Sequence, residues 1–194
     1  MTTPPSAGTR TPIAWWECEA RRLRRDQEEI RACFPDLLFR NDGAGGWQGV
    51  LPRWPFDRPE PARLADWIGG CGLELLLEYG QAYPIVAPRI FPVDPLPEPW
   101  EWTQHCWHLN GDASLCLLRD DVWTGRESVV DLLLKAAGWR IEYALMKHRA
   151  IEQMTSSGIV ADDSLDQLLV CPPEPGDTAR PGEPDAAGQG GSAC

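Results

Sequence analysis

The sequence predicts an α+β domain with an N-terminal helix, an antiparallel meander sheet and a C-terminal helix. Two observations lead to this fold class. Segments with the period of a β-strand follow one another between residues 37 and 93, with only one short helical segment among them. The long stretches of helical periodicity lie before and after that group, at about residues 12–33 and 128–149. Strands that are consecutive in the chain favour antiparallel pairing, with the helices on one side of the sheet.

The first helix is predicted over residues 12–33. Thr11 can cap it, Pro12 suits the first helical position, and Pro35 follows its end. The side chains of its expected inner face recur at steps of three and four residues, and they are Trp16, Ala20, Leu23, Gln27, Ile30 and Phe34.

A β-hairpin is predicted next. Residues 37–40 and 47–51 flank the turn sequence Asn-Asp-Gly-Ala-Gly-Gly, whose residues tolerate positive φ. Four prolines within residues 52–61 exclude a central strand there. We therefore expect an irregular connection, followed by a short helix over residues 62–68.

Two further strands complete the predicted sheet. Leu73, Leu75, Leu77 and Tyr79 occupy alternate positions, with glutamates between them, which indicates a half-buried strand. Residues 89–93 form the last predicted strand, ahead of a proline-rich loop.

The second long helix begins after Ser128, which can cap it together with Asp131 in a capping box. Its helical spacing continues to about Arg149, and a weaker helix is expected over residues 164–170.

The domain organisation follows from these elements and from composition. We expect one α+β domain over residues 11–155. Residues 1–10 are small and polar and should be disordered. Residues 156–194 form an acidic tail rich in proline and glycine, and most of it should be disordered.

The composition narrows the functional classes. A formal net charge of −11 disfavours binding to a nucleic-acid backbone, because that binding needs a basic face. No segment approaches the ~18 apolar residues of a membrane span, and no secretory signal opens the chain, so we expect a cytoplasmic protein. Seven cysteines at irregular spacing predict thiols in a reducing compartment rather than a disulfide framework. No motif calls for a cofactor.

The segment from His105 to Trp123 concentrates reactive side chains, with two of the three histidines and two of the seven cysteines. A Cys-His hydrolase would use His108 or His148 as the base for Cys116. A cysteine that only fills the core is a second interpretation, since cysteine is often buried. Zinc binding is a third, although the expected paired ligand spacing is missing. The residues of zinc-ligand type are His105, Cys106, His108 and Cys116.

The order of motifs in this region resembles that of ubiquitin-conjugating enzymes, whose pattern is His-Pro-Asn, a short loop, Gly-x-Ile-Cys-Leu and a tryptophan before the next helix. The matching parts of this chain are His108-Leu109-Asn110, Asp112 to Leu117, Trp123 and Ser128-Val129, with Tyr83-Pro84 and Pro88 upstream. The resemblance covers about residues 12–150 and implies the ubiquitin-conjugating fold, with an active-site loop between the sheet and the last helix.

The chain departs from that pattern in three ways. Leu109 replaces the proline, Ala113 stands at the usual glycine, and the loop before Cys116 is about two residues shorter. These departures are typical of the divergent bacterial branch found in antiphage CBASS operons and in bacterial ubiquitin-like conjugation operons.

The resemblance assigns roles to individual residues. Cys116 would carry an acyl group as a thioester, and Asn110 would stabilise the oxyanion of the transfer step or order the loop. His108 would brace the loop. Asp120 and Asp121 would orient an incoming amine, if they do more than form a solvated acidic loop.

The first helix of the family helps to bind the activating enzyme, which gives its arginines a possible role in partner binding. A solvated face, with Glu28 and Glu29 as ion-pair partners, explains the same residues nearly as well. The arginines are Arg21, Arg22, Arg24 and Arg25.

The resemblance therefore implies an acyl carrier with antiviral defence as its biological setting. It would receive a protein C-terminus from an enzyme of the ubiquitin-activating type and pass it to an amine, without metal, cofactor, nucleic acid or membrane. The carried protein would be ubiquitin-like or a nucleotidyltransferase. The alternatives are a catalytically silent module that binds a peptide or a ubiquitin-like tail, and a Cys-His hydrolase.

Overall fold

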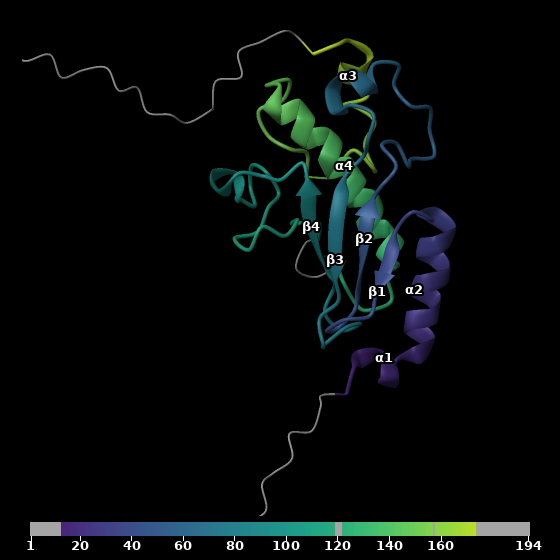
Figure 1. Ribbon diagram of the computed structural model, residues 1–194. Helices are drawn as coiled ribbons and strands as arrows, with labels where there is room; N and C mark the ends of the chain where they lie inside the picture. Colours follow the sequence, from purple (N-terminus) through teal and green to yellow (C-terminus); the bar gives the residue numbers. More distant parts are fainter. Residues whose placement is uncertain (1–12, 119–121, 157, 174–194) are drawn as a thin grey trace, which may run out of the picture.

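The computed structural model describes residues 13–118, 122–156 and 158–173. Within them, an antiparallel sheet runs in the order β1-β2-β3-β4 (Figure 1). Its strands are β1 (Leu38–Arg40), β2 (Gly46–Val50), β3 (Glu74–Glu78) and β4 (Arg89–Asp94). The helices are α1 (Trp15–Cys18), α2 (Ala20–Cys33), α3 (Leu64–Ile68) and α4 (Val129–Lys147), with 3₁₀ turns η1 (Pro99–Glu101) and η2 (Leu168–Val170). The predicted α+β class with a meander sheet is confirmed.

The core lies between the sheet and helix α4, which crosses behind the strands, while α2 lies beside β1 and also contacts α4 (Figure 1). The predicted alternation in β3 is confirmed, because Leu75 and Leu77 are at most 1% exposed. Leu77 is paired with Trp47 of β2, which is fully buried. The hairpin between β1 and β2 is confirmed as well, with Phe39 opposite Trp47.

The N-terminal helix differs from its prediction. It is broken at Glu19, which ends α1 and precedes α2 with φ −114° and ψ 44°. The break turns Trp15 into the core, where its Nε1 donates a hydrogen bond to the Ala44 carbonyl oxygen at 2.7 Å. The predicted helix start at residues 11 and 12 lies outside the described residues.

The buried face of α2 was predicted only in part. Ile30 and the adjacent Phe34 are buried as predicted, but Ala20 is exposed, and the predicted pattern omits Arg22 and Asp26, which are buried. The physical reason is a buried ion pair. Arg22 Nε lies 3.0 Å from Asp26 Oδ1, so two charged residues occupy positions that a pattern of apolar residues cannot identify.

Residues 158–173 pack onto the end of α4, so the fold continues past residue 155, where the sequence placed its boundary. Ile159 and Leu169 are fully buried against α3 and α4. The helix predicted over residues 164–170 is a series of turns that ends in η2. The segment comes very close to α4: a Cβ added at Gly138 would lie 2.8 Å from Ile159 Cγ2. Residues 174–194 lie outside the described residues, as do residues 1–10.

None of the helices in the described part of the chain has both the length and the apolar character that a membrane span requires.

Candidate active site

A small hairpin positions Cys116. Leu109 and Leu115 form an antiparallel bridge, and the Cys116 amide donates a hydrogen bond to the His108 carbonyl oxygen at 2.8 Å. The Leu115 amide donates to the Ile90 carbonyl oxygen at 2.8 Å, which attaches the hairpin to β4. Cys116 therefore follows a hairpin that is held to the edge strand of the sheet.

The turn of this hairpin needs an unusual backbone conformation. Ala113 has φ 67°, in the left-handed region that glycine adopts most easily. The Ala113 amide donates to the Asn110 carbonyl oxygen at 2.9 Å, and the Asn110 amide donates to the Ser114 carbonyl oxygen at 2.8 Å. The turn thus holds Ala113 in a conformation where an alanine is strained.

The side chain of Asn110 is engaged within the loop. Its Nδ2 donates to Ser114 Oγ at 3.0 Å and to the Leu115 carbonyl oxygen at 3.4 Å, while its Oδ1 accepts from Gln104 Nε2 at 2.8 Å. Both ends of the amide are therefore occupied. Of the two roles expected for Asn110, these contacts fit that of ordering the loop, because all of them lie within the segment from Gln104 to Leu115.

A carboxylate completes the loop. Asp112 Oδ1 accepts hydrogen bonds from the amide and hydroxyl of Ser114, and Asp112 Oδ2 accepts from Arg89 at 3.1 Å. The bonds from Ser114, with a smaller contribution from Arg89, lower the pKa of the Asp112 carboxyl. The loop is stabilised by an ionised side chain at neutral pH.

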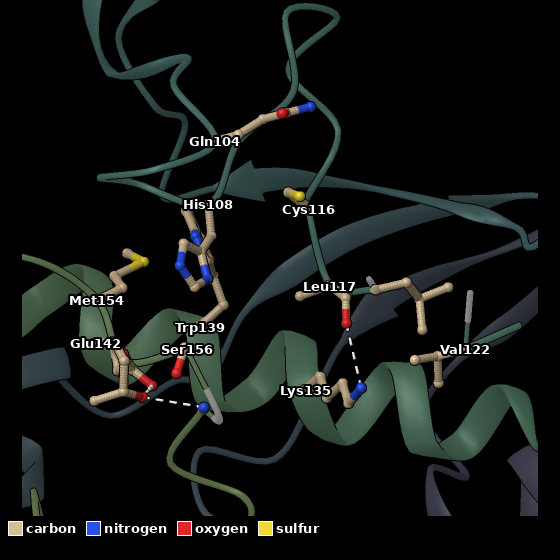
Figure 2. A pocket seen from close by; sticks show the side chains of 13 residues that line it. Gln104, His108, Cys116, Leu117, Val122, Lys135, Trp139, Glu142, Met154 and Ser156 are labelled. Atoms are coloured by element: carbon tan, nitrogen blue, oxygen red, sulfur yellow. Dashed lines mark hydrogen bonds between the residues drawn. The ribbon is translucent and has the colours of Figure 1, made fainter. Parts of the chain in front are cut away.

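Cys116 is half-buried and lies where two hollows meet. The first has a volume of about 460 Å³ and is lined by His108, Lys135, Trp139 and Glu142, among others (Figure 2). The second has a volume of about 390 Å³. Its lining includes Arg89, Gln104, Asn110, Asp112 and Leu132. Cys116 thus lines two adjoining hollows, which also share Gln104, Leu117 and Leu118.

Helix α4 supplies one wall of the first hollow. Lys135, Trp139 and Glu142 follow one another at steps of four and three, so they share a face of the helix. Lys135 Nζ donates to the Leu117 carbonyl oxygen at 3.2 Å (Figure 2). Trp139 Nε1 donates to the Trp107 carbonyl oxygen at 2.9 Å. Sequence analysis assigned these residues no role in a site, although Lys135 and Glu142, seven residues apart on one face of the helix, were a usable signal.

A second wall of the first hollow is formed by the chain after α4. Met154, Thr155, Ser156 and Gly158 line it. Glu142, only 3% exposed, accepts hydrogen bonds from the Thr155 amide at 2.6 Å and the Ile159 amide at 2.9 Å. A buried carboxylate therefore fixes this wall.

The histidines lie at different places. His108 is half-buried and faces the same hollow as Cys116 (Figure 2). His148 follows α4, is exposed, and packs edge-on against Trp67 with the ring centroids 5.4 Å apart. Of the two, only His108 lines a space that Cys116 also lines.

The zinc interpretation finds no support in the geometry. Among the described residues, His, Cys, Asp and Glu side chains do not gather into a group that could hold a metal ion. His105 is exposed, and Cys106 Sγ contacts the Glu152 carbonyl oxygen at 4.0 Å.

Asp120 and Asp121 lie outside the described residues.

The four arginines named from the first helix, which lie in α2, have three kinds of surroundings. Arg21 and Arg24 are exposed, as partner contacts would have to be. Arg25 pairs with Glu29 at 2.7 Å, as the solvated-face interpretation predicts. The prediction for Arg22 is wrong: its side chain is buried, and its guanidinium donates to Tyr83 Oη and to the carbonyl oxygens of Gly125 and Glu127. Arg22 joins α2 to the segment before α4.

Comparisons with protein-family models, curated proteins and solved structures gave no match for this chain.

Proposed function

We propose that this chain is a ubiquitin-conjugating-like acyl carrier whose α+β domain is a variant of the ubiquitin-conjugating fold. Motifs that are distant in the sequence meet in a way that supports the proposal. Trp123 Nε1 donates a hydrogen bond to the Pro84 carbonyl oxygen at 2.8 Å, which joins the segment after Cys116 to the Tyr83-Pro84 motif. The order of helix, meander, loop and helix is that of the family.

The observation that carries the proposal is the place of Cys116 between two hollows. An acyl carrier must admit two substrates in turn: the thioester that loads it and the amine that unloads it. A half-buried thiol that borders two spaces gives each substrate an approach. Cys116 differs in this respect from a fully buried cysteine, whose thiol no substrate could approach.

The chemistry needs only a thiol and an amine. The Cys116 thiolate attacks the carbonyl carbon of a thioester on the activating enzyme, a new C–S bond forms, and the donor thiolate leaves. A neutral amine then attacks the carbonyl carbon on Cys116. The C–N bond forms, the C–S bond breaks, Cys116 leaves as a thiolate, and the proton of the amine passes to solvent.

The partners belong to the same proposal. The activating enzyme would contact the exposed Arg21 and Arg24 through an acidic surface, since complementary charge steers such encounters. The carried C-terminus would belong to a ubiquitin-like protein or to a nucleotidyltransferase, and the setting would be bacterial antiphage defence.

One observation favours a second candidate, a Cys-His hydrolase: His108 faces the hollow that Cys116 borders.

A thioester probe tests the carrier function directly. We expect a peptide that ends in Gly-Gly, supplied as its 2-mercaptoethanesulfonate thioester, to form an adduct on Cys116 that reducing thiols remove. Cys116→Ala should lose this adduct, and Cys116→Ser should form an ester that resists thiols. Cys106→Ala is the matched control, because Cys106 is also half-buried but lines neither hollow, and it should load normally.

The adduct is assigned by mass spectrometry after digestion, and added lysine should convert it to an amide. An unchanged yield of adduct in Cys116→Ala would refute the carrier assignment. Rapid loss of the acyl group to water in the absence of an amine, abolished by His108→Ala, would instead establish the hydrolase.

Asn110→Ala separates the two roles of this amide. Because its amide is occupied within the loop, we expect both the loading of Cys116 and the transfer to lysine to fall together, and the free energy of unfolding to drop by about 1–3 kcal/mol. An oxyanion donor would behave differently. Its removal would slow the transfer by about 10²–10³-fold and leave loading unchanged. Single-turnover rates of the two steps, with Gln104→Ala as the companion variant, decide between them.

A further inference from the structure

The chain is nearly devoid of side-chain amines. Of its 18 basic residues other than histidine, 16 are arginines, and only Lys135 and Lys147 are lysines. A guanidinium stays protonated at neutral pH and does not act as an acyl acceptor, whereas a lysine amine loses its proton more readily and can attack a thioester. Self-acylation of the folded chain at a lysine is therefore limited to two positions.

The two lysines have different surroundings. Lys147 is exposed at the end of α4, where its Nζ lies 2.8 Å from Glu101 Oε1 and 5.6 Å from the centre of the Trp100 ring. It lines neither hollow beside Cys116. The Lys147 amine therefore forms an ion pair with Glu101, away from the two hollows.

Lys135, in contrast, lies beside Cys116 in the candidate active site. It is half-buried, it lines the hollow of about 460 Å³ together with Cys116, and its Nζ donates to the carbonyl oxygen of Leu117, the residue that follows Cys116 (Figure 2). The acceptor of this bond is a neutral carbonyl. Among the described residues no carboxylate forms an ion pair with Lys135, and Glu142 in the same hollow is bound to Thr155 and Ile159.

We propose that Lys135 is an acyl acceptor built into the site: when Cys116 carries an acyl group, the Lys135 amine takes it over as an amide. The proposal rests on the carrier function proposed above. The neutral amine attacks the thioester carbonyl carbon, a C–N bond forms, the C–S bond to Cys116 breaks, and the proton of the amine passes to solvent. A flexible four-carbon stem lets Nζ leave the Leu117 carbonyl and reach the loaded thiol.

The transfer is intramolecular, which gives Lys135 a high effective concentration relative to an amine in solution. Its product is a chain with a thiol-resistant acyl group in the hollow beside Cys116. Such a group would occupy the space that an incoming substrate needs. Lys135 thus limits how long a loaded carrier persists when no external acceptor arrives.

The test uses the full chain and a small probe, the 2-mercaptoethanesulfonate thioester of N-acetylglycine. Wild-type protein is expected to show first a thiol-sensitive acetylglycyl group on Cys116 and then a thiol-resistant one on Lys135, at least about ten-fold more abundant than on Lys147. Cys116→Ala should lose the Lys135 amide. Lys135→Arg keeps the charge and a donor for Leu117 but has no acylatable amine, so no amide should accumulate at residue 135, and the acyl group that Cys116 takes up should remain thiol-sensitive. Lys147→Arg is the matched control and should behave like wild type.

The outcomes separate the two proposals. Loading of Cys116 without any amide on Lys135 refutes this inference and leaves the carrier function standing. Equal acylation of Lys135 in wild type and in Cys116→Ala also refutes it, because the probe would then react with the amine directly. Failure of Cys116 to load in the wild-type chain overturns both proposals. Lys135→Gln, with its unfolding midpoint compared with that of wild type, shows whether an effect on loading comes from a loss of fold.

Discussion

Replacing Arg22 by alanine is expected to lower the free energy of unfolding by about 3–5 kcal/mol, the range for removing one partner of a buried ion pair. Arg22 is 8% exposed and Asp26 is fully buried. Without the guanidinium, the Asp26 carboxylate would still accept hydrogen bonds from the hydroxyls of Tyr79 and Tyr83, but it would have lost its cationic partner. The carbonyl oxygens of Gly125 and Glu127 would lose their donor as well.

Urea unfolding followed by tryptophan fluorescence measures this loss. Arg25→Ala is the matched control from the same helix, because the Arg25–Glu29 pair is partly exposed, and such pairs contribute about 0–1 kcal/mol. Equal losses in the two variants would contradict the structural role of Arg22.

The loss in Arg22→Ala should also depend on pH. Burial raises the pKa of the Asp26 carboxyl, although the bonds from Tyr83 and the charge of Arg22 oppose the shift. The stability linked to this group is therefore present below the unfolded pKa of about 3.9 and disappears as the pH rises through the folded pKa. Removal of Arg22 raises the pKa of the Asp26 carboxyl further. The loss of unfolding free energy in Arg22→Ala is therefore expected to be smaller at about pH 5 than at about pH 8.

Glu142→Ala is the second substitution with a large expected effect. It would leave the buried amide of Ile159 and that of Thr155 without their acceptor, at about 1–3 kcal/mol each, so we expect a loss of about 2–6 kcal/mol. It should also loosen the wall of the first hollow, because this carboxylate fixes the amides of Thr155 and Ile159, on either side of Gly158 in that wall. Chemical denaturation reports the first effect, and the rate of Cys116 loading reports the second.

Two companion variants make the prediction for Glu142 specific. Glu142→Gln keeps one acceptor oxygen and should lose less stability than Glu142→Ala. Thr155→Val removes the hydroxyl that donates to Glu142 Oε1 and accepts from the Gly158 amide, each at 3.0 Å, and should lose about 1–2 kcal/mol. A Glu142→Ala variant as stable as Thr155→Val would show that the carboxylate does not hold the segment.

Local patterns predicted the sheet and the last helix well. Alternation of leucines located β3, turn residues located the hairpin, and Ser128 was identified as the cap of α4, where its Oγ accepts from the Val130 amide at 3.1 Å. Each of these signals depends on a residue and its near neighbours. The hairpin from His108 to Cys116 is also local, because short-range hydrogen bonds close it.

The errors came from contacts between distant parts of the chain. The burial of Arg22 depends on carbonyl groups about a hundred residues away, and no spacing within α2 reveals them. The segment over residues 158–173 was assigned to the tail on composition, yet its few apolar side chains, such as Ile159 and Leu169, are all that packing against α4 requires. Lys135 was missed because a lysine in a helix predicts a solvated face, not a hollow beside a cysteine.

The close approach of Ile159 to Gly138 has a consequence for recognising relatives of this chain. Within a helix, alanine is favoured over glycine by about 1 kcal/mol, so α4 by itself gains nothing from Gly138. A related chain whose fold ended with this helix would be free to place alanine there. We therefore expect a glycine at position 138 in related chains whose residues after α4 pack against this helix and form the second wall of the site.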